Sequence, residues 1–434
     1  MRLEYSYRTE RFGAVRISPL QRVVEIDGSA ADSEIERVQG DGSTRVVGRE
    51  TLQGIERDMV IVVPCMNEPR RVIEGVLAGI PHDCLIVLVS NSDRSPVDRY
   101  DIELRSLEEY CRLANRPALA VHQRDPGVGA AMKAAGMPEI VDEVAGGVRA
   151  GKGEAMILAM ALAAMTGRRY IGYVDADNYV PGSVHEYCKV YASGLALADS
   201  PYSMVRIAWD SKPKVRDGRL FFSKRGRTSE VTNDFLNRLL AEYSGFGTDA
   251  IVTGNAGEHA LSLELGLRMR MAGGFAVEPF QFVELFERFS GLPLNWEHSG
   301  GVIAEDPILM QRLGVVLSQI GTCNPHFHDN KGDEHVQSMR FQALNVLYHS
   351  PVCPPALRTE ILDFLILQGA LEPGQAPPVE RIYPPVGTLA LDRLYDGLST
   401  EATSFRQFGH RLSVTPRTVV PIQRDRVPET SVLA

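Results

Sequence analysis

Two carboxylates in the middle of the chain directly follow an apolar run and are well placed to do chemistry. Residues 170–174 form a short β-branched and aromatic run, as expected for a buried strand, and Asp175 and Asp177 come next. Strand residues two apart point to the same face, so both carboxylates can converge on one target. Two close anionic groups favour a hard cation, and Mg²⁺ typically takes one or two protein carboxylates together with phosphate oxygens. A solvated Asp-Ala-Asp turn is the alternative interpretation.

A glycine-rich segment with one lysine, residues 146–154, precedes a run rich in Ala, Met and Leu that predicts a helix. Backbone N–H groups of such a turn, with Lys152 beside them, make a natural phosphate cradle, so Gly151 and Lys152 are candidate phosphate-binding residues. The spacing matches a P-loop until Gly153, where a P-loop needs Ser or Thr to hold Mg²⁺. This disfavours a P-loop kinase, and a flexible loop capped by lysine is the alternative.

A second anion-binding region is predicted further along the chain. Residues 212–227 are dense in Lys and Arg, although the whole chain has a net charge of −9. This local patch could receive an acidic substrate, and a solvated basic hairpin is the alternative. Residues 251–260 are rich in glycine, with Thr and Asn, and lead into a predicted helix over 260–271, which offers another anion cradle. Two anion sites suggest that two phosphorylated ligands meet.

His326 and His328 are the remaining candidates for chemistry. Their imidazoles share a face if the segment is extended, and histidine can bind a metal that is already held by aspartate. A structural role for both is the alternative. The residues themselves do not indicate which of the two would be the ligand.

Buried strands are expected to position these groups. Continuous apolar runs at 59–64, 85–90 and 117–121 are typical of parallel strands covered on both faces. Each run ends in polar residues, and helical segments separate the runs. Repeated alternation of strand and helix predicts an α/β fold, with a parallel sheet and helices on both faces. The polar strand ends should then meet at the sheet edge where ligands bind.

The two ends of the chain carry no chemical motif. Residues 1–55 predict a strand-rich lead-in that contains a hairpin over 15–17 and 22–28. Residues 351–434 predict a helical C-terminal extension and a mobile tail. We expect its helices at 355–368 and 389–408.

Composition limits the class of protein. The 434 residues can bury a sizeable core, and the negative charge gives no nucleic-acid footprint. Six scattered cysteines without a Cys-x-x-Cys pair suggest neither a zinc ribbon nor a disulfide framework. The N-terminus lacks an apolar signal core, and no stretch approaches a transmembrane helix in length. We expect a cytoplasmic protein with no nucleic-acid or membrane partner, and a homodimer.

In order and combination, these motifs resemble the mannosyl-3-phosphoglycerate synthase family over roughly residues 55–350. The resemblance is carried by residues 64–68, 151–155, 175–177, 219–233, 254–258 and 324–328. It implies a GT-A glycosyltransferase fold, with a mostly parallel Rossmann-like sheet, helices on both faces and the C-terminal helical extension. The catalytic domain would span 56–350, with a nucleotide-sugar half at about 56–185 and an acceptor half at about 186–350.

The resemblance implies transfer of mannose from GDP-mannose to the hydroxyl of 3-phosphoglycerate, with retention at the anomeric carbon. Mg²⁺, or another divalent ion such as Mn²⁺ or Co²⁺, would assist, and the product would lead to mannosylglycerate, a compatible solute. The similar glucosyl-3-phosphoglycerate synthases, with GDP-glucose or UDP-glucose as donor, are the alternative. An enzyme selects between two sugars that differ at one hydroxyl, or between two bases, through a few hydrogen bonds, and motifs do not show these bonds.

Residue roles follow once that reaction is supposed. Asp177 and one of His326 and His328 should hold the metal against both phosphates of GDP, with Lys152 adding positive charge. Asp175 should lie nearest the sugar, and Asp175, Asp177 and Lys152 are the expected catalytic residues. The nucleotide side should be lined by Pro64, Asn67, Glu68, Asn91, Gly151, Lys152, Asp175 and Ala176. The acceptor side should be lined by Arg219, Arg225, Thr253, Gly254, Asn255 and Glu258. Retention through a carboxylate nucleophile and retention by front-face attack both remain open.

Three other classes are less consistent with the sequence. A haloacid-dehalogenase phosphatase normally has Thr or Val two positions after the second Asp, near the N-terminus, and this chain has Tyr179 there. A nucleotidyltransferase would carry a loop of Gly, Arg and Lys after the first buried strand, where residues 65–68 read Cys-Met-Asn-Glu. A non-catalytic regulator would bind a GDP-sugar without turnover, which an assay of GDP release would reveal.

Overall fold

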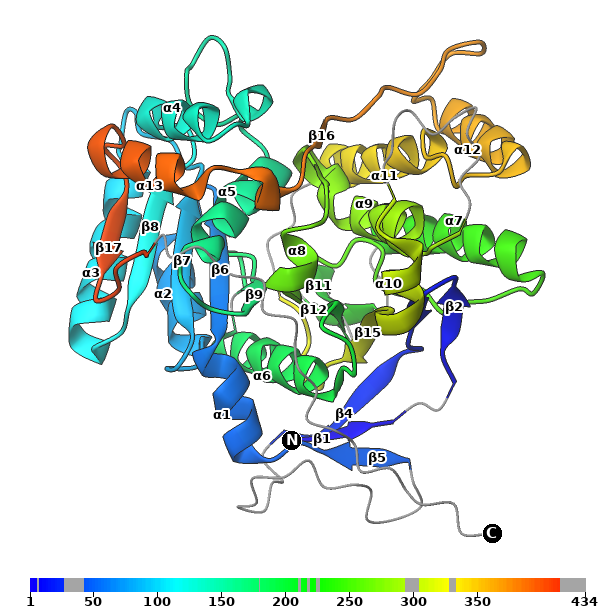
Figure 1. Cartoon of the computed structure of the whole chain (residues 1–434), viewed down its shortest axis with the longest axis horizontal. Helices are drawn as coiled ribbons and strands as arrows, with labels where there is room; N and C mark the ends of the chain where they lie inside the picture. The colour runs from blue at the N-terminus through cyan, green and yellow to red at the C-terminus, as the bar shows by residue number, and fades with distance from the viewer. Residues whose placement is uncertain are drawn as a thin grey trace.

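The protein is built on one large mixed sheet with helices on both faces (Figure 1). The computed structural model describes residues 1–5, 8–26, 43–178, 180–209, 212–216, 219–223, 227–292, 304–327 and 333–413. The strand order is β17-β8-β7-β6-β9-β13-β10-β15-β4-β1-β5. The strands that position the site are β6 (Met59–Cys65), β7 (Leu85–Ser90), β8 (Ala118–His122), β9 (Tyr170–Tyr173), β10 (Ser203–Ala208), β13 (His259–Ser262) and β15 (Val315–Gly321).

The sheet is mostly parallel, with one antiparallel strand near its centre. The strands β8, β7, β6 and β9 run parallel to one another, whereas β13 runs antiparallel between β9 and β10. β10 and β15 are again parallel. The predicted α/β class and mostly parallel sheet are therefore confirmed.

Alternate residues of β6 show why its sequence is continuously apolar. Met59, Ile61 and Val63 belong to one hydrophobic cluster, and Val60 and Val62 belong to the cluster on the opposite face. A strand covered on both sides needs apolar residues at every position. One face is covered by α1 (Arg49–Arg57), α2 (Arg70–Gly79), α3 (Arg99–Ala114) and α6 (Pro181–Leu197). The other is covered by α4 (Pro126–Ala134), α5 (Lys152–Ala164), α7 (Arg227–Ser244), α9 (Val277–Glu284), α10 (Pro307–Leu313), α11 (Asp333–Tyr348), α12 (Pro355–Leu367) and α13 (Leu391–Thr400).

The N-terminal segment extends the central sheet, and the predicted hairpin is wrong. β3 (Val15–Ile17) and β4 (Gln21–Glu25) do not pair with each other, because both run parallel to β15, one along its beginning and the other along its end. The remaining strands complete this edge: β2 (Glu10–Phe12) pairs with β3, and β1 (Arg2–Glu4) pairs with β4 and β5 (Thr44–Val46).

The C-terminal segment is also tied into the core. α12 confirms the first predicted helix, but the second, predicted over 389–408, ends at Thr400 as α13. β17 (Arg406–Phe408) then pairs antiparallel with β8 and covers an edge that would otherwise expose unpaired backbone groups (Figure 1). The predicted tail beyond residue 413 lies outside the described residues.

The helix predicted over 260–271 is wrong as well. The glycine-rich loop leads into β13, which is fully buried between β9 and β10, because tertiary pairing at the centre of the sheet overrides local helix propensity. The short α8 (Leu263–Gly266) and β14 (Met271–Ala272) follow, and β14 pairs with β16 (Ile382–Tyr383). The basic segment forms a separate hairpin of β11 (Lys212–Arg216) and β12 (Arg219–Ser223).

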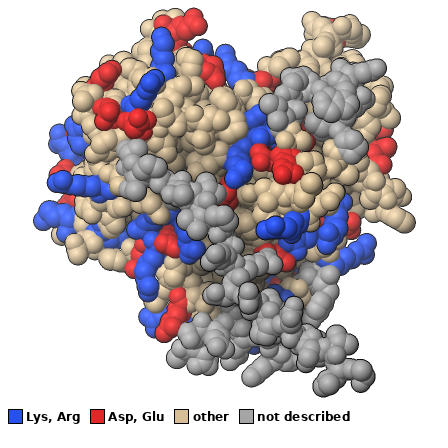
Figure 2. All heavy atoms as spheres, in the orientation of Figure 1, with Lys and Arg blue, Asp and Glu red and all other residues tan. Residues whose placement is uncertain are grey.

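On the face drawn in Figure 2, acidic and basic side chains of the described residues are interspersed over the surface. Within the described ranges, no helix is long and apolar enough to cross a membrane.

Candidate active site

A cavity of about 750 Å³ lies at the carboxyl ends of β6, β7, β8 and β9. It brings together many of the candidate residues from distant parts of the sequence. Those that line it are Pro64, Glu68, Asn91, Gly151, Lys152, Asp175, Ala176, Asp177, Asn255, Glu258 and His326. The polar strand ends therefore meet at one edge of the sheet, as the strand pattern predicts.

Four other candidates lie away from the lining. Asn67 has a left-handed φ of 69° and pairs with Asp93, so its side chain fixes the turn after β6. Thr253 donates its hydroxyl to Gln319 Oε1 at 2.7 Å, and Gly254 donates its N–H to Asn233 Oδ1 at 2.8 Å. Arg219 is exposed on the β11–β12 hairpin. Arg225 and His328 lie outside the described residues.

Lys152 is held between two carboxylates. Its Nζ lies 2.8 Å from Asp175 and 2.9 Å from Glu278 Oε1, and Glu278 is only 1% exposed. Burial alone would lower the pKa of Lys152, but Asp175, Glu278 and Glu258 raise it above its ordinary value. Lys152 is therefore a permanently charged ammonium that fixes the Asp175 carboxylate.

Glycine at position 257 lets a second loop approach this pair. A Cβ atom there would lie 2.7 Å from Asp175 Oδ2 and 2.8 Å from Lys152 Nζ, closer than van der Waals contact permits. The next residue, Glu258, is fully buried, and Asn178 Nδ2 donates to its Oε1 at 3.0 Å. Burial and the charge of Asp175 raise the pKa of Glu258 to about 8. This carboxyl group therefore takes up a proton more readily than an ordinary glutamate.

A buried arginine, Arg206, is hydrogen-bonded to the backbone of the same loop. Arg206 on β10 is 0% exposed, and its Nε and Nη2 donate to Thr253 O at 3.1 and 2.9 Å. Its Nη1 donates to the amide oxygen of Gln281. The amide nitrogen of Gln281 lies 2.8 Å from His259 Nε2, and His259 Nδ1 lies 2.9 Å from Gly257 O. This network therefore fixes the loop at Thr253 and at Gly257, and thereby positions Asn255 and Glu258.

Asp177 and His326 both line the cavity, and their chemistry fits a divalent cation. Both are largely buried, at 8% and 5% exposed. His326 stacks on Trp209 with ring centroids 4.3 Å apart, and its Nδ1 lies 3.3 Å from the Tyr187 hydroxyl, so the ring is held on two sides. The described residues contain no group of three or more potential metal ligands. Mg²⁺ does not require one, because it is usually bound by one or two carboxylates together with water and phosphate oxygens.

The sequence interpretation missed several residues of the site, among them Gln123 and Glu278. Gln123, just after β8, donates its amide nitrogen to Gly151 O at 3.0 Å and to Arg149 O, which fixes the amide orientation. Its Oε1 is buried in the cavity lining and has no hydrogen-bond partner among the described residues. The rule that singled out Asn91, a polar residue at a strand end, applies equally to Gln123. Glu278 on α9 follows no motif and could be found only in three dimensions.

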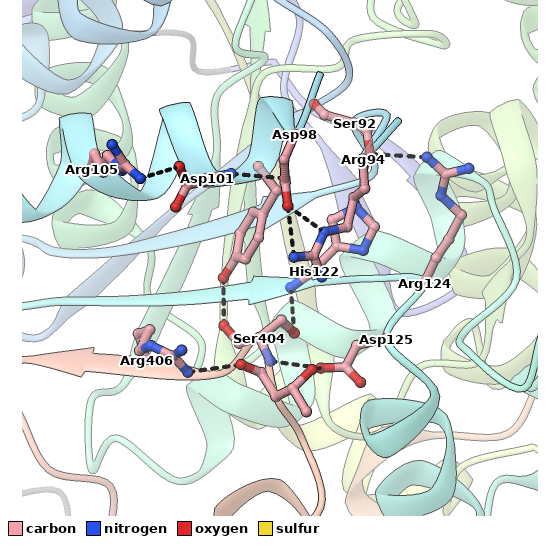
Figure 3. A network of polar contacts seen from close by, with 12 residues as sticks. Ser92, Arg94, Asp98, Asp101, Arg105, His122, Arg124, Asp125, Ser404 and Arg406 are labelled. Atoms are coloured by element: carbon pink, nitrogen blue, oxygen red, sulfur yellow. Dashed lines mark hydrogen bonds and ion pairs between the residues drawn. The ribbon is translucent and has the colours of Figure 1, made fainter. Parts of the chain in front are cut away.

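The strand ends next to the cavity are fixed by a polar network around Ser404 (Figure 3). The backbone N–H of His122 donates to Ser404 Oγ, and the backbone N–H of Ser404 donates to Asp125 Oδ2 at 2.7 Å. Arg124 Nη2 donates to the carbonyl oxygens of Asn91 and Ser92 at 3.0 and 2.9 Å. The C-terminal segment thus fixes the end of β8, and Arg124 fixes the end of β7 that carries Asn91.

The order β8-β7-β6-β9-β13-β10, with β13 antiparallel and Asp-Ala-Asp at the carboxyl end of β9, is the arrangement expected of a GT-A glycosyltransferase fold. The family model for mannosyl-3-phosphoglycerate synthase matches residues 5–398. The chain therefore belongs to the mannosyl-3-phosphoglycerate synthase family.

Two relatives with the name mannosyl-3-phosphoglycerate synthase show how far this similarity extends. The protein from Pyrococcus furiosus is 39% identical over 409 residues, which cover 94% of this chain and 100% of the relative. The protein from Aeropyrum pernix is 38% identical over 389 residues, covering 89% of this chain and 95% of the relative.

Solved structures of glucosyl-3-phosphoglycerate synthase from Mycobacterium tuberculosis are more distant. Its complex with Mn²⁺, UDP and phosphoglyceric acid is 17% identical, with a TM-score of 0.45 over 77% of this chain and 94% of that chain. Its complex with Mn²⁺, UDP-glucose and phosphoglyceric acid is 18% identical, with a TM-score of 0.46 over 77% of this chain and 93% of that chain.

Proposed function

We propose that this protein transfers mannose from GDP-mannose to the hydroxyl of 3-phosphoglycerate, with retention at the anomeric carbon. The observation that carries the proposal is the convergence of Asp175, Asp177, Lys152 and Glu258 in one cavity, in a chain of this family. The cavity volume lies within the range typical of small-molecule and cofactor sites.

For the donor, Asp177 and His326, with His328 as a further candidate, would hold a divalent cation such as Mg²⁺. When bound, that cation would neutralise the charge of the departing GDP phosphates. Pro64, Glu68 and Asn91 line the side of the cavity proposed for the nucleotide. The paired position of Lys152 supports a role in holding Asp175 ionised towards the sugar, more than a direct contact with phosphate.

For the acceptor, we propose Asn255 and the start of α7, which line the same cavity, as the binding residues. Both polar atoms of the Asn255 side chain are buried, without a hydrogen-bond partner in the described part of the chain. Thr228 and Ser229, at the start of α7, also line the cavity, and a helix N-terminus favours an anion. We therefore propose that the phosphate or carboxylate of 3-phosphoglycerate binds here. Arg219 and Arg225 on the adjoining basic segment remain candidates for the same anion.

Product analysis tests the reaction. The protein, with GDP-mannose, 3-phosphoglycerate and Mg²⁺, should form a mannosyl-3-phosphoglycerate whose anomeric carbon keeps the α configuration of the donor in its NMR spectrum. Excess EDTA should abolish the reaction, and added Mg²⁺ should restore it. An inverted product, or release of mannose to water alone, would contradict the proposal.

A further inference from the structure

One helix links the two parts of the proposed metal site. α6 begins at Pro181, shortly after Asp177, and its first two turns contact residues 323–326 at the end of β15. Asp177 and His326 are 149 residues apart in the chain by their numbers, 177 and 326. Asp177 and His326 are therefore joined through α6, which follows Asp177 in the chain and contacts the segment that ends at His326.

The side chains of α6 that make these contacts are buried, and their polar atoms are hydrogen-bonded. Glu186, 0% exposed, accepts hydrogen bonds from the backbone N–H groups of Cys323 and Asn324 at 2.6 and 2.9 Å, and from Asn324 Nδ2 at 2.7 Å. Ser183 Oγ donates to Pro325 O at 3.2 Å. A buried carboxylate is costly unless it is hydrogen-bonded, so Glu186 strongly favours this one conformation of the turn before His326.

The last contact reaches the imidazole itself. The hydroxyl of Tyr187, also 0% exposed, lies 3.3 Å from His326 Nδ1, and Trp209 stacks on the same ring. Because Nδ1 faces the Tyr187 hydroxyl, we assign Nε2 as the ring nitrogen that would bind the metal. Groups that contact the second ring nitrogen of a ligating histidine orient the ring and tune its affinity for metal.

We propose that Glu186 and Tyr187, on the first turns of α6, are positioning residues that hold His326 at a fixed place relative to Asp177. This inference rests on the proposed assignment of Asp177 and His326 as metal ligands. Neither α6 residue touches substrate in this account. They act by setting the geometry in which a divalent cation is held.

Mn²⁺ binding tests the inference without any assay of turnover. The full-length protein, with and without saturating GDP, would be titrated with Mn²⁺ and the free ion measured by electron paramagnetic resonance. Tyr187→Phe should weaken Mn²⁺ binding by about 10–100-fold. Glu186→Gln should do the same by loosening the turn, and it serves as the second variant should Tyr187→Phe fail to fold, as judged by circular dichroism.

Tyr191→Phe is the matched control. Tyr191 lies one turn further along α6, is equally buried, and donates its hydroxyl to Tyr173 O at 2.7 Å. Among the described residues, it makes no hydrogen bond with residues 323–326. It should lose a similar amount of thermal stability and keep wild-type Mn²⁺ affinity. His326→Ala should lose Mn²⁺ binding. This variant tests whether His326 is a metal ligand, separately from whether Glu186 and Tyr187 position it.

The outcomes are distinct. Weak binding in Tyr187→Phe and Glu186→Gln, with normal binding in Tyr191→Phe, supports the inference. Normal binding in Tyr187→Phe and Glu186→Gln, with loss in His326→Ala, overturns the inference and leaves the metal ligands of the proposed function intact. Normal binding in His326→Ala overturns the ligand assignment and the inference together.

Discussion

Gly257→Ala is the substitution that the site geometry predicts most sharply. The added methyl group would lie 2.7 Å from Asp175 Oδ2 and 2.8 Å from Lys152 Nζ, so both atoms must move by several tenths of an ångström. They are the ends of side chains, so the fold can accommodate the shift. A reacting group misplaced by about 1 Å can lose about 10²-fold in rate. A shift of several tenths of an ångström should therefore lower kcat by about 10-fold to 10²-fold, or about 1.4–2.7 kcal/mol.

Steady-state kinetics and thermal unfolding would be measured together. Tm should change little, and kcat should fall while the KM for donor changes less. Gly266→Ala is the matched control, because its methyl group would lie 2.7 Å from Met160 Cε, again a side-chain end but far from the carboxylates. Wild-type kcat in Gly257→Ala would refute the claim that Lys152 holds the Asp175 carboxylate in the position that the reaction needs.

Three further predictions address the metal, the acceptor and pH. Asp177→Asn keeps size but removes charge, so activity should fall by orders of magnitude with Tm unchanged; a near-normal rate at saturating Mg²⁺ would remove Asp177 from the site. Arg219→Ala should raise the KM for 3-phosphoglycerate, by a loss of about 1.5–3 kcal/mol, and leave GDP-mannose binding unchanged, whereas an unaltered acceptor KM would leave Arg219 as a solvated hairpin residue. Burial raises the pKa of Glu103 from 4.5 to about 6, so the fold retains a proton that the unfolded chain releases, and stability falls as pH rises through that window. Glu103→Gln should remove about 2 kcal/mol of this pH dependence in urea unfolding at pH 4.5 and 7, and an unchanged dependence would contradict the raised pKa.

Local patterns were sufficient to predict the strands β6, β7, β8 and β9 and several of the residues at their ends. The continuous apolar run of β6 requires cover on both faces, and the Asp-Ala-Asp triplet ends a buried strand, so the position of Asp175 at the sheet edge follows from sequence alone. The period of the strands and their polar ends carry that information within a few residues.

Features decided by distant contacts could not be predicted in this way. The segment that begins at His259 has the composition of a helix, but a free position between β9 and β10 makes it a strand. Lys152 has the spacing of a phosphate ligand, yet its partners Asp175 and Glu278 come from other elements. The pairing of β17 with β8 joins residues almost 300 positions apart, 118 and 408, and no local pattern marks it.

The most direct test of the proposed function compares three donors against 3-phosphoglycerate. Steady-state rates would be measured with GDP-mannose, GDP-glucose and UDP-glucose at the same Mg²⁺ concentration. The account predicts the highest kcat/KM with GDP-mannose, because both sugar and base should be selected by a few buried hydrogen bonds in the cavity. A clear preference for UDP-glucose would contradict it.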